Sequence, residues 1–367
     1  MQPQTFIETI GHFLVNSIPL IILAIIGVSF LIVFHEFGHL IFAKLFNVYA
    51  PSFSIGFGPR ILQKKIGETT FALSAIPLGG YVELAGSEEE TETGQPSTPN
   101  PRSFNAKPYW QKLLIMFGGI LFNLIFAYAT FTALYMTGAP GIGSTYDENQ
   151  KPIIQAVHSG TPAEKAQLKE GDVLTGVNNK ATPNTKSFLE ELTPFIGKPV
   201  TIDILRNGSA QKIELTSESQ GEGAQKKPRL GVTWHTEKKA FLEAVKAGFN
   251  TTNELAAKIF GIFKNIGKER GQLGGPLALI HQVTQFAAQG WKMFFFMLAF
   301  ISVNLAVFNL LPFPIFDGGQ ILFFTIEAIM KRPLSDKARE AIHYYTWLAV
   351  IGLVIFLTFN DILKFFK

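Results

Sequence analysis

Four long apolar runs constrain this chain more than any other feature of its sequence. A helix needs about 20 apolar residues to cross the ~30 Å hydrocarbon core of a bilayer. The runs cover Ile18–Phe46, Leu113–Met136, Met293–Leu311 and Tyr345–Phe359 with its flanks. The whole chain is 47% hydrophobic, which is high for a soluble enzyme. We therefore expect a polytopic α-helical membrane protein with four transmembrane helices that lies in the lipid bilayer.

The charged residues and the missing cysteines narrow the chemistry. The net charge is a modest +4, and no run of Lys and Arg is interleaved with aromatic residues, so we expect no nucleic acid partner. The sequence contains no cysteine, which excludes thiolate metal sites. Any bound metal must therefore be held by His, Asp or Glu.

The distribution of Lys and Arg predicts the orientation of the helices. The connections between the first two runs and between the last two are rich in basic residues, whereas residues 1–17 contain none. Short basic connections face the cytoplasm. We therefore expect the amino terminus and the region 138–289 on the opposite side of the membrane.

The region 138–237 is polar and has the pattern of a small soluble domain. Short apolar strands alternate with helix starts, and Asn207-Gly208 is typical of a two-residue hairpin turn. Residues Pro152–His235, and the stretch PAEKAQLKEGD in particular, resemble a bacterial PDZ domain. The resemblance implies an α+β domain with a peptide ligand in its groove.

Two further segments differ from their surroundings in composition. Ala240–Ile266 has an apolar face and several lysines, so it either lies in the membrane interface or packs on the PDZ domain. We expect amphipathic membrane-associated helices over 238–290. The acidic, Pro-rich stretch Ser87–Pro101 has no periodicity and is expected to be a disordered linker.

The first apolar run contains the sequence HEFGH, with ionisable groups at His35, Glu36 and His39. Such groups are costly at membrane depth and usually mark a functional site. Two histidines four residues apart share one helix face, and H-E-x-x-H is the zinc-binding pattern in which the glutamate acts as general base toward zinc-bound water. The alternative is a histidine pair that joins two helices by a hydrogen bond, which gives Glu36 no purpose.

A zinc site of this kind needs a third protein ligand. The stretch NLLPFPIFDGG ends the third run with two prolines that interrupt a helix, and Asp317 is its acid. By itself Asp-Gly would indicate a loop turn. The first and third runs cross in the same direction, however, so His35 and Asp317 are expected at the same edge of the bilayer. The topology therefore predicts a Zn²⁺ site of His35, His39 and Asp317.

These motifs together resemble the site-2 proteases, the intramembrane zinc metalloproteases. The resemblance rests on HEFGH, GGILFN (Gly118–Asn123), the PDZ-like domain and N-x-x-P-x-P-x-x-D-G, and it spans nearly the whole chain. Bacterial members with two PDZ domains are known, but positions 138–290 suit only one. We expect the first transmembrane helix with HExxH at 1–48, the hairpin and linker at 49–112 and the second transmembrane helix at 113–137. The PDZ domain is expected at 138–237 and the amphipathic helices at 238–290. The third transmembrane helix with the Asp-Gly motif is expected at 291–320, and a loop with the fourth helix at 321–367.

The resemblance implies a function and a location. It implies hydrolysis of peptide bonds within single-span membrane proteins, such as anti-sigma factors and remnant signal peptides. It also implies a bacterial inner membrane, with the amino terminus and PDZ domain in the periplasm and the active site toward the cytoplasm.

The family also suggests how a substrate is held. Ser52–Leu84 has the pattern of a β-hairpin turned near Lys65–Gly67, and in the family this hairpin re-enters the membrane. We expect an edge of this hairpin, at Leu73, Ser74, Ala75 and Ile76, to bind the substrate as an added strand. By analogy Asn304, Asn309 and Asn123 contact the unwound substrate, although helix packing is an equally good interpretation of Asn123.

Two other functions compete with proteolysis. A metal transporter also needs His and Asp in the membrane, but with ligands at several depths, and the remaining histidines are scattered. A non-catalytic PDZ scaffold leaves Glu36 without a role.

Overall fold

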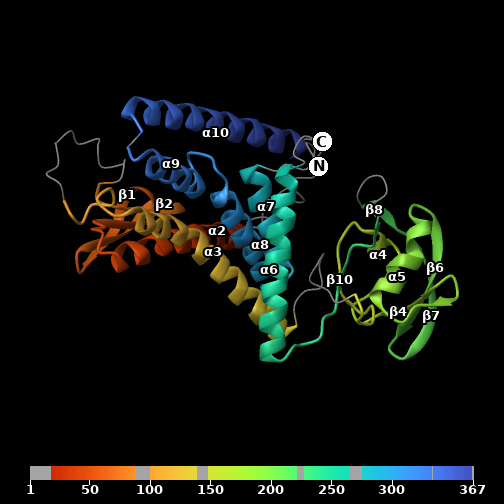
Figure 1. The fold of residues 1–367 in the computed structure, drawn as a ribbon. Helices are drawn as coiled ribbons and strands as arrows, with labels where there is room; N and C mark the ends of the chain where they lie inside the picture. The colour runs from red at the N-terminus through yellow and green to blue at the C-terminus, as the bar shows by residue number, and fades with distance from the viewer. Residues whose placement is uncertain are drawn as a thin grey trace, which may run out of the picture. The chain divides into compact units, whose positions relative to one another are not determined.

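The computed structural model describes residues 18–86, 100–138, 148–220, 227–264, 275–332 and 334–365 (Figure 1). Most of the expected linker Ser87–Pro101 and all of residues 1–17 lie outside the described residues. The chain forms two compact units, one from Phe131 to Thr251 and one from the residues on either side of that range. The second of these units carries the HEFGH sequence.

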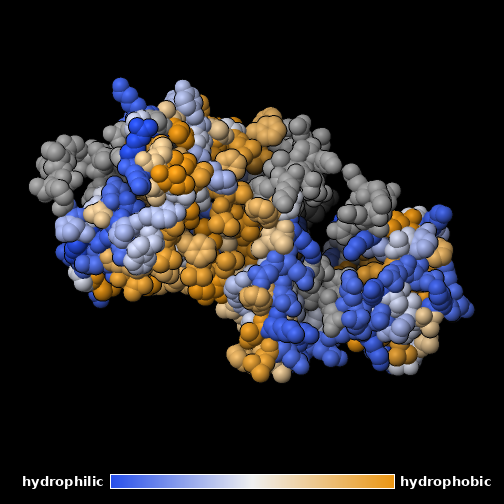
Figure 2. Space-filling model, viewed as in Figure 1, coloured by the Kyte–Doolittle hydropathy of each residue, from blue (hydrophilic) through white to orange (hydrophobic). Residues whose placement is uncertain are grey.

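Among the described residues, four helices are long and apolar enough to cross a membrane, in agreement with the four apolar runs. They are α2 (Ile18–Leu45), α3 (Tyr109–Thr137), α8 (Trp291–Leu310) and α10 (Asp336–Phe365). Apolar residues gather on the surface of the helical unit around α3 and α8 (Figure 2). Because apolar side chains on this face remain exposed to the surroundings of the protein, the surface suits lipid better than water.

Helices α2 and α3 cross in direct backbone contact. A Cβ atom on Gly38 would lie 2.3 Å from the carbonyl oxygen of Gly118, and a Cβ on Gly118 would lie 2.7 Å from the carbonyl oxygen of Gly38. Small residues permit this close approach between membrane helices, where packing rather than the hydrophobic effect holds helices together. The crossing places the HEFGH turn of α2 against the middle of α3.

The hairpin consists of β1 (Ser52–Ile66) and β2 (Thr69–Glu83), and both strands fold back on themselves. Residues 52–55 pair with 80–83 on one side and with 70–73 on the other, while 60–66 pair with 69–74. Gly56 (φ 87°) and Gly79 (φ 107°) lie where the strands bend, in a conformation that glycine adopts without strain. The result is a sheet of four segments in the order 60–66, 69–74, 52–55 and 80–83.

One edge of this sheet runs along α2. Ser29 donates a hydrogen bond to the carbonyl oxygen of Pro77, and the amide of Val82 donates to Oε2 of Glu36 at 3.2 Å. The contact therefore extends along α2 from Ser29 to Glu36, or about 10 Å along its axis. Many apolar side chains of the sheet remain exposed, namely Ile55, Phe57, Ile61, Leu62, Ile66, Leu73 and Ile76.

The remaining helices of this unit pack around α2. Helix α7 (Pro276–Ala288) and α8 share a buried apolar cluster with α2 that includes Ala24, Leu31 and Leu298. After α8 ends, residues 311–316 turn back and α9 (Asp317–Met330) begins. Residues 317–330, expected as the end of the third span and a loop, therefore form a helix of their own. The Asp-Gly motif is its first turn rather than an isolated turn between loops.

The other unit contains the inserted domain, which we define as residues 150–236. Its main sheet has the order β5-β4-β6-β7, with the hairpin turn at Asn207-Gly208 as expected. The strands are β4 (Val173–Val177), β5 (Lys180–Ala181), β6 (Pro199–Arg206) and β7 (Ser209–Thr216). Two smaller sheets pair β3 (Ile154–Val157) with β10 (Val232–Trp234) and β8 (Glu218–Gln220) with β9 (Lys227–Arg229).

Helices α4 (Pro162–Lys165) and α5 (Thr185–Leu192) complete the inserted domain. Asn184 and Ser187 form a reciprocal capping box at the start of α5, which satisfies backbone amides that have no partner within the helix. Phe188 and Leu192 of α5 are fully buried in the domain core, as their helical spacing predicts. The amphipathic segment after the domain forms α6 (Phe241–Lys264).

An ion cluster ties the turn of the hairpin to α2 and to the residues before α3. Oε1 of Glu68 lies 2.8 Å from Nζ of Lys44 and 2.6 Å from Nη2 of Arg102. Hydrogen bonds from Arg102 and Lys44 lower the pKa of Glu68 from 4.5 to about 2. The cluster favours the carboxylate form, so its stabilising effect depends on pH.

We predict that Glu68→Gln is less stable than the unchanged protein at pH 6 and that this difference fades as the pH falls. The folded-state pKa is depressed, so the contribution is fully present above pH 4.5 and is lost as the pH drops toward 2. Thermal unfolding in detergent at a series of pH values measures the difference. Equal stability of the two proteins at pH 6 would contradict a stabilising cluster.

Candidate metal centre

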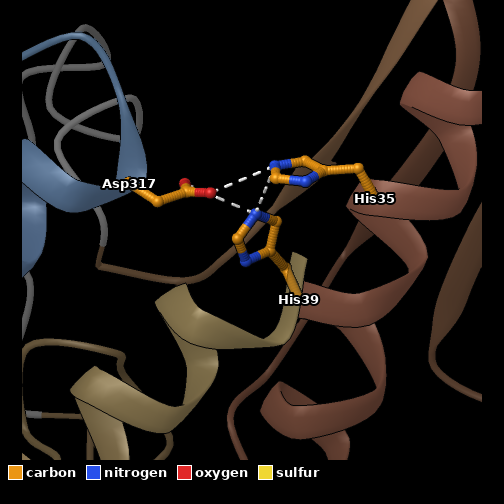
Figure 3. A group of neighbouring side chains, drawn as sticks. All are labelled: His35, His39 and Asp317. Atoms are coloured by element: carbon orange, nitrogen blue, oxygen red, sulfur yellow. Dashed lines mark hydrogen bonds and ion pairs between the residues drawn. The ribbon is translucent and has the colours of Figure 1, made fainter. Parts of the chain in front are cut away.

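His35 and His39 of α2 and Asp317 of α9 point toward one another (Figure 3). Nε2 of His35 lies 3.1 Å from Oδ2 of Asp317, and Nε2 of His39 lies 3.5 Å from Oδ1 of Asp317. The two Nε2 atoms are 3.2 Å apart. Both imidazoles are buried, and the carboxyl group is nearly so. The structure thus brings Asp317, which is distant in the sequence, against the histidine pair of α2.

The glycines of the Asp-Gly motif explain how α9 presents its carboxyl group. A Cβ on Gly318 would lie 2.3 Å from the carbonyl oxygen of Leu310, and one on Gly319 would lie 2.0 Å from that of Phe313. Side chains at these positions would push the first turn of α9 away from the loop before it. The absence of a Cβ at both positions lets Asp317 begin the helix directly against the end of α8.

The three donor atoms have the spacing and the chemistry of a metal site. Four ligands about 2.0–2.2 Å from Zn²⁺ in a tetrahedron lie about 3.3 Å from one another. Nδ1 of His39 donates to the carbonyl oxygen of Ile115 at 2.8 Å. A neutral ring that donates from Nδ1 carries a lone pair on Nε2, which can bind a metal. Oδ2 of Asp317 is buried without a hydrogen bond from any described residue. Electron-pair donors that face each other in this way need a cation between them.

Gly119 of α3 leaves the space for such a cation. A Cβ atom at this position would lie 2.5 Å from Nε2 of His39 and 2.7 Å from Nε2 of His35. Any larger residue would therefore fill the space in front of the donor atoms. The residues present fit a zinc ion.

Comparisons with known proteins agree with this geometry. The model of peptidase family M50 matches residues 23–353. The chain belongs to peptidase family M50. A protein of Clostridium perfringens described as a zinc metalloprotease is 32% identical over 348 residues, which are 94% of this chain and 98% of that protein. A protein of Rickettsia conorii with the same description is 30% identical over 359 residues, 94% of this chain and 98% of its own.

These findings show that the protein is a metallopeptidase of the site-2 protease family and that its cofactor is zinc. Among solved structures, the PDZ domain of an SdrC-like protein from Listeria monocytogenes is similar over 25% of this chain and 93% of that domain, with 19% identity and a TM-score of 0.20. A likeness of this extent leaves the PDZ identity of the inserted domain a prediction.

Glu36 follows His35 directly on α2, and its Oε2 accepts a hydrogen bond from the amide of Val82. The structure also narrows the expected substrate edge. Leu73 pairs with Ile55 on one side and with Leu62 on the other, and Ser74 pairs with Arg60. The segment Leu73–Ile76 therefore begins inside the sheet, and its first residues are not available to a further strand. Sequence reasoning missed this because a simple hairpin has two free edges at every position, whereas these strands double back.

The three asparagines have different surroundings. Nδ2 of Asn309 lies 3.4 Å from Nε2 of His35, next to the donor atoms. Nδ2 of Asn304 instead donates to the carbonyl oxygen of Phe300 within α8. Asn123 is fully buried, with its amide 3.1 Å from Nδ1 of His35. Asn309 is thus beside the metal centre, whereas Asn123 lies behind one of its ligands.

We predict that Gly119→Ala lowers zinc affinity by tenfold or more, at least the loss that mutation of a hydrogen-bonding partner of a metal ligand typically causes. The added methyl group overlaps two of the donor nitrogens. Gly352→Ala in α10 is the control, because a Cβ there meets nothing within 4 Å. Chelator competition on purified protein gives the affinities. Unchanged zinc binding in Gly119→Ala would exclude a metal in this space.

Proposed function

We propose that this protein is an intramembrane endopeptidase that cuts within the transmembrane segments of single-span membrane proteins. The observation that carries the proposal is that His35 and His39 lie in α2, a helix of membrane-spanning length, and converge with Asp317 at the start of α9. In the proposed mechanism His35, His39 and Asp317 would hold the zinc ion, which would supply a Lewis acid for the scissile carbonyl. Glu36 is the general base that accepts a proton during the attack.

The β-hairpin is proposed to hold the substrate as an added strand. Its segment 80–83 pairs with residues 52–55 on one side, and its other side faces α2. The amide of Val82 points away from β1 and donates to the carboxylate of Glu36. Helix α2 therefore already lines this side of 80–83, and a substrate strand has no room there. We keep the proposed substrate edge within Leu73–Ile76, at the exposed residues Ala75 and Ile76.

The proposed role of Asn309 follows from its place beside the donor atoms. Its amide can donate to the carbonyl oxygen of a substrate that reaches the zinc ion. Asn304 stays a proposed substrate contact by resemblance alone, since its amide is engaged within its own helix. A substrate carbonyl that displaced the hydrogen bond to Phe300 could accept from the same amide of Asn304.

The contacts of the hairpin with α2 support its re-entry into the membrane. Segment 77–82 follows α2 from Glu36 to Ser29, deeper along the apolar helix, and the sheet exposes apolar side chains. At the other end, Glu68 binds Lys44 and Arg102, charged groups that belong at a membrane surface. The hairpin is proposed to enter from the cytoplasmic side of a bacterial inner membrane and return to it. The active site then lies toward the cytoplasm.

The inserted domain and α6 are proposed to lie on the periplasmic side, together with the amino terminus. Gly248 of α6 packs against Thr132 of α3, and Thr251 is hydrogen bonded to Tyr135. The apolar residues Phe241, Leu242 and Phe249 remain exposed. This arrangement favours the membrane interface for the apolar face of α6. The inserted domain is proposed to be a PDZ domain with a peptide ligand.

By the family resemblance we propose anti-sigma factors and remnant signal peptides as substrate classes. The transporter alternative requires ligand groups at several depths. Within the part of the chain that the structure describes, His35, His39 and Asp317 are the one group of three or more metal-ligating side chains. This single centre supports a catalytic metal over a conduction path.

We predict that Glu36→Gln keeps zinc but loses cleavage, whereas Asp317→Ala loses both. Glutamine preserves the shape of the side chain but cannot accept the proton, and such a loss of base catalysis costs about 10²–10⁴-fold in rate. Elemental analysis and cleavage of a transmembrane model peptide in detergent measure the two properties. Normal zinc content and activity in Asp317→Ala would remove that residue from the site.

We predict that Ala75→Pro lowers kcat/KM about three- to tenfold without changing zinc content. The substitution removes one hydrogen-bond donor from a sheet edge, where proline is tolerated, and a net hydrogen bond contributes about 0.5–1.5 kcal/mol. Ala75→Ser, which keeps the amide, is the control. If the proline variant cuts the model peptide as fast as the serine variant, strand addition at this edge is wrong.

A further inference from the structure

One face of α3 supports the back of the metal centre. Ile115, Gly119 and Asn123 are spaced four residues apart on this helix, so they lie along one stripe. The carbonyl oxygen of Ile115 holds Nδ1 of His39, and Gly119 leaves room for the cation. At the third position, Nδ2 of Asn123 lies 3.1 Å from Nδ1 of His35. We propose that Asn123 is a positioning residue that orients His35 and sets the zinc affinity.

Asn123 cannot contact a substrate, and its surroundings fix it in place. The residue is 0% exposed. Its backbone carbonyl accepts a hydrogen bond from Ser302 of α8 at 2.8 Å, which joins α3 to α8. Its side-chain Oδ1 is buried without a hydrogen bond from any described residue. A buried amide with an unsatisfied oxygen is costly unless another state of the site uses that oxygen.

The tautomer in which His35 binds a metal uses Oδ1 of Asn123 as a hydrogen-bond acceptor. A neutral imidazole that offers its Nε2 lone pair to a metal carries its proton on Nδ1. Of the two amide atoms of Asn123, Oδ1 alone can accept this proton. Rotation of the amide by half a turn exchanges Oδ1 with the nitrogen that now faces Nδ1. In the zinc-bound enzyme Oδ1 therefore accepts from Nδ1 of His35, and ring orientation and tautomer are both fixed.

The two histidines thus have unlike partners. His39 is held by a backbone carbonyl, which no substitution of Ile115 removes, whereas His35 depends on a side chain. Loss of the acceptor behind His35 would let its ring turn or adopt the other tautomer. Zinc affinity is then the property that Asn123 controls, and this inference rests on the zinc site assigned under the proposed function.

The test compares zinc affinity in Asn123→Leu, Asn123→Asp and Ser302→Ala, measured by chelator competition on the full chain in detergent. Leucine fills a similar volume without an acceptor and is expected to weaken zinc binding 10- to 100-fold, the usual range for such partners of a ligating histidine. Aspartate accepts the same proton and is expected to stay within about threefold of the unchanged protein. Ser302→Ala removes a neighbouring buried hydrogen bond and is expected to leave zinc affinity unchanged.

A second readout separates positioning from general damage to the fold. Because Asn123 is buried away from substrate, Asn123→Leu at subsaturating zinc should lower kcat and leave KM for a transmembrane peptide unchanged. Thermal unfolding of the metal-free variants measures any loss of packing. The proposal is overturned if Asn123→Leu binds zinc like the unchanged protein, or if Asn123→Asp loses as much affinity as Asn123→Leu.

A His35→Ala control distinguishes failure of this inference from failure of the proposed function. If His35→Ala loses zinc while Asn123→Leu keeps it, the role of Asn123 is wrong and the zinc site stands. If His35→Ala binds zinc as tightly as the unchanged protein, the zinc site is wrong and the role of Asn123 falls with it.

Discussion

The backbone contact between Gly38 and Gly118 is the constraint on which the rest of the centre depends. Because α2 and α3 touch at this point, a carbonyl group and an asparagine side chain of α3 come within hydrogen-bonding distance of two histidines on α2. A side chain at either glycine would overlap the backbone of the other helix and push the helices apart, which would stretch these hydrogen bonds. Two residues without side chains thus position the residues whose side chains carry the chemistry.

The convergence of His35, His39 and Asp317 could be predicted from the sequence because it depends on helical spacing and on the order of the apolar runs. The four-residue spacing of His35 and His39 fixes their common face, and the direction of two spans brings Asp317 to the same depth. The hairpin turn and the core positions of α5 follow equally from local pattern. In each case the deciding information lies within a few residues or in the order of the apolar runs.

The features that could not be predicted depend on contacts between distant segments. The doubling back of β1 and β2 requires positive φ angles at Gly56 and Gly79, and glycine in a strand does not by itself reveal a bend. Asn123 in an apolar helix has several interpretations until its partner, 88 residues away, is known. Helix α9 could not be predicted because an Asp-Gly pair after two prolines is more typical of a loop.

The sheet that doubles back has a consequence for which membrane helices can be cut. In hydrocarbon an unwound helix leaves amide and carbonyl groups without partners, at several kcal/mol for each group. The two inner segments of the sheet are paired on both sides, and α2 lines the outer side of 80–83, so the proposed edge at Ala75 and Ile76 is exposed for only a few residues. On the proposed mechanism, that length limits how many residues of a substrate can leave the helix together. Helices that already contain a weak turn within this length would reach the metal, while uniformly stable helices in the same membrane would pass the enzyme intact.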